Sequence, residues 1–362
     1  MKAATYNPEL KKTSCLELTK TARPSLSKNN AIVKIKVVGV CGSDLLKLDR
    51  SLVKPGIILG HEMVGEIEEI SEEMSSQYGF QVGDRIVSSH HVPCLECDYC
   101  LRGKESLCTQ FKTTNFNPGA FCEYLELSEG HLKHTVQKVP DHLTDLEASF
   151  TEPVACCIKA IQPSLRKPVI ASTAKQSPKL SHLVIGLGSI GLIMGQLIKH
   201  YYPEDTVTGL DLDEKRLKLA EELDFDSVIA SAASQSSGLD HDVANAPRDD
   251  TQYDHIYLCA GANATVDLAV KHARNGATIT VFSSTPAEIN FPNNEIYYKE
   301  LTVRGSYSPN LNNLKDALAL LSTGKIEVNK LISHKASLDN LGKTIEKAKL
   351  EKGIKVLLEL VP

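Results

Sequence analysis

Alternating apolar and polar positions predict a β-rich first part of the chain. Between Val33 and Val37 the apolar residues alternate with Lys34 and Lys36, which is the two-residue period of a half-buried strand. Further strand-like segments follow at 63–70, 83–87 and 120–127. This pattern predicts a small barrel-like β domain in the first 150 residues.

Beyond about residue 155, short buried strands alternate with amphipathic helices. Strands are predicted at 183–185, 206–210, 255–259 and 277–282. An apolar helix is expected directly after the first of them, up to about residue 199. A regular alternation of strands and helices predicts an α/β fold with a doubly wound parallel sheet.

The strand–helix rhythm stops after Pro292. A helix at 313–321 and a last strand at 355–360 are expected to return to the first domain and complete it. The predicted division is therefore a catalytic domain of residues 1–155 and 296–362 with a cysteine-rich lobe at 90–110, and a nucleotide-binding domain of residues 156–295.

Length and composition support two domains and limit the expected partners and cellular compartment. The chain has 362 residues, a net charge of −5 and ten cysteines. The length exceeds one ordinary core, and the acidic balance gives no reason to expect nucleic acid as a partner. No signal peptide or membrane span is visible, so the cysteines are expected to be thiols or metal ligands of a cytoplasmic protein.

The stretch 38–62 carries a candidate metal site. Cys41 lies at the expected end of a strand, and His61 and Glu62 follow after a 20-residue return. A thiolate, an imidazole and a carboxylate together suit Zn²⁺. A site without four sulfur and nitrogen ligands keeps a position open for substrate, which predicts a catalytic zinc.

A second metal site is predicted from four closely spaced cysteines, since four thiolates can close a tetrahedral shell around a structural zinc. A redox cysteine pair is a poorer interpretation, because the surrounding sequence lacks the strand–helix pattern in which such pairs lie. A nucleic-acid-binding zinc ribbon is disfavoured, because residues 88–108 contain two basic side chains against three acidic ones. The four cysteines are Cys94, Cys97, Cys100 and Cys108.

A glycine-rich loop follows the strand at 183–185. The motif G-x-G-x-x-G lies between a strand and a helix, and Asp211 comes 20 residues after its last glycine. This context predicts a dinucleotide site in which the loop holds the pyrophosphate and the carboxylate binds the ribose hydroxyls. Asp211 favours NAD over NADP, an effect that Arg216 partly offsets. The candidate loop residues are Gly186, Gly188, Ser189, Ile190 and Gly191.

Together these motifs resemble the zinc-dependent medium-chain dehydrogenases, closest to the sorbitol and threonine dehydrogenase branch. The resemblance covers nearly the whole chain and implies a GroES-like catalytic domain beside a Rossmann domain. It rests on the segments 39–44, 60–62, 118–121, 152–153 and 186–191 and on the four-cysteine lobe.

The resemblance implies roles for the residues around the catalytic zinc. Cys41 and His61 are expected ligands, and the third protein ligand is expected to be Glu62 or Glu152. Ser43 corresponds to the hydroxyl that takes the substrate proton. Leu46 stands where many relatives have a relay histidine, so the proton would leave through water or through another group, with His90 and His91 as candidates.

The resemblance also implies a cofactor pocket and an oligomer. Val281, Ser283 and Ser306 are expected to line the nicotinamide site, and Asp211 with Arg216 matches the ribose-binding pair of the polyol branch. A homodimer or homotetramer is expected, with residues 296–307 at the interface.

The function predicted from these features is zinc- and NAD-dependent oxidation of a small secondary alcohol of the polyol type to a ketone. A threonine 3-dehydrogenase, a sugar-phosphate dehydrogenase or a cyclitol dehydrogenase remains an alternative. A zinc-free NADPH reductase of the same fold is disfavoured by Cys41, His61 and Asp211.

Overall fold

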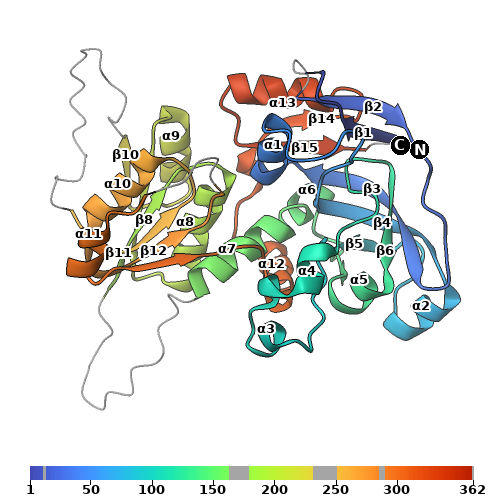
Figure 1. The fold of residues 1–362 in the computed structure, drawn as a ribbon, viewed down its shortest axis with the longest axis horizontal. Coiled ribbons are helices and arrows are strands. Elements are labelled where there is room, and N and C mark those ends of the chain that lie inside the picture. Colours follow the sequence, from blue (N-terminus) through green and yellow to red (C-terminus); the bar gives the residue numbers. More distant parts are fainter. Residues whose placement is uncertain (11–13, 163–178, 231–250, 285–289, 361–362) are drawn as a thin grey trace. The chain divides into compact units, whose positions relative to one another are not determined.

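The computed structural model describes residues 1–10, 14–162, 179–230, 251–284 and 290–360. The chain forms two compact units (Figure 1). The first unit comprises Met1–Ala155 and Pro309–Pro362, and the second comprises Cys156–Ser308. Residues 296–308 thus belong to the second unit, where the sequence prediction had placed them in the first. None of the described helices is long and apolar enough to cross a membrane.

The first unit is built on a mixed sheet with strand order β14-β15-β3-β4-β5-β7, and β6 also pairs with β3. A separate pair, β1–β2, is antiparallel. Apolar residues of β3 such as Ala31, Val33 and Ile35 lie in the core. The strands are β1 Lys2–Tyr6, β2 Leu16–Lys20, β3 Asn30–Gly39, β4 Glu62–Ile70, β5 Arg85–Val87, β6 Tyr124–Ser128, β7 Gln137–Lys138, β14 Ile332–Ala336 and β15 Lys355–Glu359.

Short helices connect these strands. They are α1 Gly42–Asp49, α2 Glu72–Tyr78, α3 Asp98–Leu101, α4 Thr109–Thr113, α5 Glu129–His134, α6 Asp145–Ala148, α12 Leu311–Ser322 and α13 Leu341–Leu350, with 3₁₀ turns at Glu105–Leu107 and Asn329–Leu331. Helix α7, Thr151–Ile161, runs from the first unit into the second.

The second unit is a parallel sheet with order β10-β9-β8-β11-β12-β13. Chain order runs outward in both directions from β8 and β11, so the topological switch point lies between them. Its strands are β8 Ser181–Ile185, β9 Thr206–Asp211, β10 Ser227–Ala230, β11 Tyr253–Leu258, β12 Ala273–Val281 and β13 Thr302–Gly305; its helices are α8 Ser189–Tyr201, α9 Glu214–Glu222, α10 Asn263–His272 and α11 Asn293–Tyr298. The predicted α/β fold class is confirmed.

Candidate active site and metal centres

Three strands of the first unit bring distant residues to one point. In the sheet, Gly39 pairs with Glu62 of β4 on one side and with Leu357 of β15 on the other. A Cβ atom at Gly39 would come within 2.0 Å of Glu62 Oε2 and 3.0 Å of Lys355 Cε. Gly39 therefore leaves the space in which these two side chains meet.

Cys41 follows β3 and is the N-cap residue of α1. Its Sγ accepts the backbone N–H of Ser43 at 3.5 Å, and its own N–H donates to Asp44 Oδ2 at 3.2 Å. These bonds hold the thiol at the start of the helix. Ser43 itself is exposed.

His61 comes from the loop that enters β4. Gly60 before it has φ +90°, and a Cβ atom there would lie 2.5 Å from the ring of the buried Phe121. The His61 Nδ1 atom lies 3.4 Å from Asp44 Oδ1. Burial lowers the pKa of His61, but the Asp44 carboxylate and the Cys41 sulfur outweigh it and raise that pKa well above its usual value. Because Nδ1 faces Asp44, Nε2 remains for a metal.

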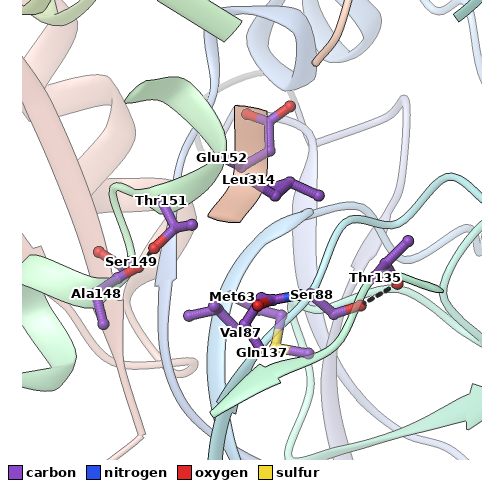
Figure 2. A pocket seen from close by; sticks show the side chains of 10 residues that line it. All are labelled: Met63, Val87, Ser88, Thr135, Gln137, Ala148, Ser149, Thr151, Glu152 and Leu314. Atoms are coloured by element: carbon purple, nitrogen blue, oxygen red, sulfur yellow. Dashed lines mark hydrogen bonds between the residues drawn. The ribbon is translucent and has the colours of Figure 1, made fainter. Parts of the chain in front are cut away.

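The ligand atoms of Cys41, His61 and Glu62 all lie within 4.8 Å of one another. A thiolate, an imidazole and a carboxylate at this separation fit zinc, and no further described His, Cys, Asp or Glu belongs to the group. Glu152, the alternative carboxylate, is outside it. Glu152 is buried and lies beside Leu314 at a small pocket that Met63 and Ser88 also line (Figure 2).

Lys355 is a residue of this site that the sequence analysis missed. Its Nζ donates to Glu62 Oε2, and both side chains are almost completely buried. Burial lowers the pKa of Lys355, but the Glu62 carboxylate, with smaller contributions from Cys41 and Glu152, raises it overall. The sequence signal was a lysine directly before three apolar residues in a predicted strand.

Replacing Lys355 with methionine is expected to reduce the free energy of unfolding by about 3–5 kcal/mol, because the buried Glu62 carboxylate loses its partner. Urea unfolding would measure the change. Lys343→Met, at an exposed position of α13, is the matched control. A loss in Lys355→Met no larger than in the control would show that Glu62 does not depend on this pair.

The two candidate relay histidines have different surroundings. The ring of His90 lies 4.7 Å from that of His61, and its Nδ1 atom is buried without a hydrogen-bond partner in the described part of the chain. Burial, followed by the charges of His61, His91 and Lys47, holds the pKa of His90 well below its usual value. His91 instead has its Nδ1 atom 2.8 Å from the Thr114 carbonyl oxygen. His90 therefore borders the metal set, and His91 is tied to the backbone.

His131 supports this region through contacts with Ser128 Oγ at 2.9 Å and the His90 carbonyl oxygen at 3.2 Å. Burial lowers the pKa of His131 to about 4.

Between pH 6.5 and 4 the unfolded chain therefore binds a proton at His131 that the folded chain excludes. The free energy of unfolding thus falls as pH falls, by about 3 kcal/mol for this group. His131→Gln, compared with His134→Gln on the same helix, is expected to flatten that slope in unfolding measured between pH 7 and 4. An unchanged slope would contradict the assignment.

The four-cysteine lobe forms a second centre. Cys94 Sγ lies 3.5 Å from Cys108 Sγ and 4.0 Å from Cys100 Sγ. Tetrahedral thiolates around zinc are about 3.8 Å apart, so these separations fit a closed structural site. Burial raises the pKa of Cys108, but the N–H groups of Cys94 and Phe111 and the neighbouring thiols bring it down to about 6. Cys97 completes the set, and all four thiols are free of disulfides.

In the second unit the glycine loop lies between β8 and α8. Gly186 has φ +95°, and a Cβ atom there would meet Ala260 after β11 at 2.6 Å. A Cβ atom at Gly191 would lie 2.0 Å from the Gly186 carbonyl oxygen. Gly188 is the N-cap of α8, with no side-chain cap and open space where a Cβ would be. The open helix N-terminus, which begins with Ser189 and Ile190, fits a pyrophosphate.

Other predicted cofactor residues lie at the same carboxyl edge of the sheet. Asp211 ends β9, accepts the Leu187 N–H at 2.7 Å and lies 3.7 Å from Arg216 Nη1. Val281 ends β12, and its carbonyl accepts the N–H of Ser306 at 3.0 Å. Ser283 Oγ is buried without a partner in the described residues. A fixed carboxylate and an unsatisfied hydroxyl at this edge fit a dinucleotide.

Asp211→Ser is expected to lower kcat/KM for NAD by about 10–100-fold, the value of one or two hydrogen bonds to a charged group, and to raise it for NADP. Steady-state kinetics with both cofactors would measure the shift. Glu214→Gln, which removes an exposed negative charge from α9, should leave the preference unchanged. Equal losses with both cofactors would contradict a ribose contact.

Comparison with known proteins identifies the family. Residues 27–141 match the alcohol dehydrogenase GroES-like domain, and residues 189–323 match the zinc-binding dehydrogenase family. The chain belongs to the zinc-dependent medium-chain dehydrogenases. It is a dehydrogenase that uses zinc and NAD, as the sequence predicted.

Individual relatives are similar to this chain over almost the full length of both proteins. A sorbitol dehydrogenase of Halalkalibacterium halodurans is 31% identical over 344 residues, covering 92% of this chain and 93% of that protein. A D-arabitol-phosphate dehydrogenase of Enterococcus avium is 26% identical over 94% of this chain and 92% of its own. A crystal structure of an Escherichia coli CFT073 alcohol dehydrogenase complexed with NADH has a TM-score of 0.79 at 25% identity, covering 99% of both chains.

Proposed function

We propose that Cys41, His61 and Glu62 hold the catalytic zinc of a sugar-alcohol dehydrogenase. The observation that carries the proposal is that their ligand atoms lie within 4.8 Å of one another, with Asp44 beside the His61 ring. Glu62 is favoured over Glu152 as the carboxylate ligand because Glu152 lies outside this group. Lys355 positions Glu62 and balances its charge.

Different residues of the chain would bind the cofactors, orient the ligands and accept the proton during alcohol oxidation. Zinc, when bound, supplies Lewis acidity that lowers the pKa of a substrate hydroxyl, and NAD, when bound, accepts the hydride. Ser43, exposed two residues after Cys41, takes the hydroxyl proton. Asp44 fixes the orientation of the His61 ring, and the loop at Gly188 with Asp211 holds the dinucleotide.

The substrate class is supported by the relatives, which are named for sorbitol and for D-arabitol phosphate. NAD reduction by the zinc-loaded chain would be followed with sorbitol, xylitol, D-arabitol, a cyclitol, threonine and sugar-alcohol phosphates. Turnover of at least one sugar alcohol or its phosphate ester is expected. Turnover of threonine alone would replace this proposal with the amino-acid alternative.

The chain is also proposed to form a homodimer or homotetramer through the β13 edge. Val303 lies on this strand, whose free side has no partner strand in the described sheet. Tyr297, Tyr298 and Tyr307 beside it are exposed by 72%, 77% and 56%. Light scattering should give two or four chains for wild type and a smaller assembly for Val303→Pro; a monomeric wild type would overturn the proposal.

The compartment is proposed to be the cytoplasm. None of the ten cysteines, all of which lie in the described residues, forms a disulfide bond, which suits a reducing environment.

A further inference from the structure

Ser333 lies at an irregularity in the strand pairing beside Lys355. Strands β14 and β15 are parallel neighbours in the sheet of the first unit (Figure 1). Ile332 pairs with Lys355, but the next pair is His334 with Val356. Ser333 is therefore an extra residue of β14 at this point. Bulges of this kind are frequent next to active sites, where they change the direction of a side chain.

The hydroxyl group of Ser333 binds the main chain of Lys355 on both sides of its Cα atom. Ser333 Oγ donates to the Lys355 carbonyl oxygen at 2.9 Å and accepts the Lys355 N–H at 3.2 Å. It also accepts the N–H of Ile354 at 3.0 Å. The register of β15 with β3 begins only at Leu357, two residues later. The main chain of Lys355 therefore depends on the β14 side, where Ser333 lies.

The orientation of Ser333 is set by its own neighbours. A Cβ atom at Gly353 would lie 2.8 Å from Ser333 Oγ and 3.0 Å from His334 Nδ1, so glycine permits the close approach of the two segments. His334 Nδ1 lies 3.1 Å from Ser333 Oγ, and its Nε2 lies 2.8 Å from Glu351 Oε2. These contacts hold the hydroxyl against the start of β15.

The side chain of Lys355 has little room to compensate for a shift of its main chain. Its Nζ atom contacts Glu62 Oε2, and the two side chains are exposed by only 3% and 1%. A Cβ atom at Gly39 would lie 3.0 Å from Lys355 Cε, so this side chain is packed tightly along its length. A displacement of the Lys355 main chain would therefore move Nζ relative to Glu62.

We propose that Ser333 is a positioning residue of the catalytic site. By fixing the main chain of Lys355, it sets the contact between Lys355 Nζ and Glu62 and thereby the affinity for the catalytic zinc. Hydrogen-bond partners of metal ligands orient those ligands and tune metal affinity. This inference rests on the proposed function, because it takes Glu62 as a zinc ligand.

Zinc affinity tests the inference with a matched set of variants. The zinc of the Cys41 site would be titrated by competition with a chelator in wild type, Ser333→Ala, Ser333→Thr and Ser337→Ala. Ser333→Ala is expected to bind this zinc about 3–10-fold more weakly, the value of one hydrogen bond, while the zinc of the four-cysteine lobe is unaffected. Ser333→Thr, which keeps the hydroxyl, and Ser337→Ala, at an exposed position after the same strand, should match wild type. Equal affinity of Ser333→Ala and wild type, or an equal loss at both zinc sites, would overturn the inference.

A double-mutant cycle tests whether Ser333 acts through the lysine. In the Lys355→Met background, Ser333→Ala should cause no further loss of zinc affinity at the Cys41 site, because the contact that it positions is already absent. Lys355→Gln, whose amide can donate to Glu62, takes the place of Lys355→Met if that variant does not fold. An equal loss in both backgrounds would show that Ser333 acts by another route and would overturn the inference.

A crystal structure of Ser333→Ala separates failure of this inference from failure of the proposed function. Compared with a wild-type crystal structure, the contact between Lys355 Nζ and Glu62 Oε2 is expected to lengthen or break. An unchanged contact would overturn the inference whether or not the site holds zinc. A wild-type protein that binds no zinc at Cys41 would instead refute the proposed function, and the comparison of the two structures would still decide whether Ser333 positions Lys355.

Discussion

Replacement of Cys41 with serine is expected to lower kcat/KM for alcohol oxidation by at least about 10⁴-fold. Zinc lowers the pKa of bound water by about nine units, and one unit corresponds to about 1.36 kcal/mol. Less than half of the resulting total, about 5 kcal/mol, already accounts for a 10⁴-fold change in rate. A single hydrogen bond, such as one from Ser43, contributes far less.

The comparison needs a control for the loss of a thiol. Cys15 is half-buried and belongs to neither cysteine-containing metal set, so Cys15→Ser should retain wild-type kinetics. His61→Ala should match Cys41→Ser, since both remove a ligand of the same ion. Activity of Cys41→Ser within about tenfold of wild type would rule out the proposed ligand set, because a lost metal ligand costs far more than one hydrogen bond.

Replacement of Cys100 with serine is expected to disorder the cysteine lobe. Among the described residues, the buried members of the apolar cluster of the lobe are Cys100, Cys108 and Phe111, and Cys94 and Cys97 pack at its edge. A structural zinc contributes about 10–16 kcal/mol to the folding of a small metal-bound domain, so the lobe depends on its metal.

The lobe is also joined to α12, because Glu105 Oε2 accepts the N–H of Leu311 at 2.8 Å and Asn310 Nδ2 donates to the Gly103 carbonyl at 3.0 Å. Limited proteolysis of Cys100→Ser should therefore cut first within residues 94–108, and thermal unfolding should begin at lower temperature. Tyr99→Ser, at a half-exposed position of the lobe, is the control. Proteolysis equal to wild type would show that the lobe does not need the Cys100 thiolate.

Local patterns were sufficient to predict much of this molecule. The strand–glycine–helix motif and Asp211 predicted the parallel sheet, and they place the proposed nucleotide site at its carboxyl edge, because chain direction alone brings the carboxyl ends of parallel strands together. The spacing of the four cysteines predicted the lobe in the same way. These signals are contained in short stretches of sequence.

Features that depend on tertiary pairing could not be predicted. Lys355 meets Glu62 only because β15 and β4 pair on opposite sides of β3, 293 residues apart along the chain. The proposal of Glu62 rather than Glu152 as the carboxylate ligand of zinc depends on the same strand pairing, which places Glu62 opposite Gly39. Residues 120–122 were predicted to begin a strand, but Ala120 and Phe121 instead bond to Gly60 and Leu59 before His61, and β6 starts at Tyr124. The second unit extends to Ser308 rather than to the predicted residue 295, because β13 pairs with β12 at the edge of its sheet.

The central claim is that the chain holds two zinc ions at separate sites, one of them at Cys41, His61 and Glu62. The most direct test is the zinc content per chain of wild type, Cys41→Ser and Cys100→Ser, measured by elemental mass spectrometry on the purified proteins. We expect two ions in wild type and one in each variant, with the lobe of Cys41→Ser still resistant to protease. A single ion in wild type that is retained in Cys41→Ser would contradict the catalytic zinc site.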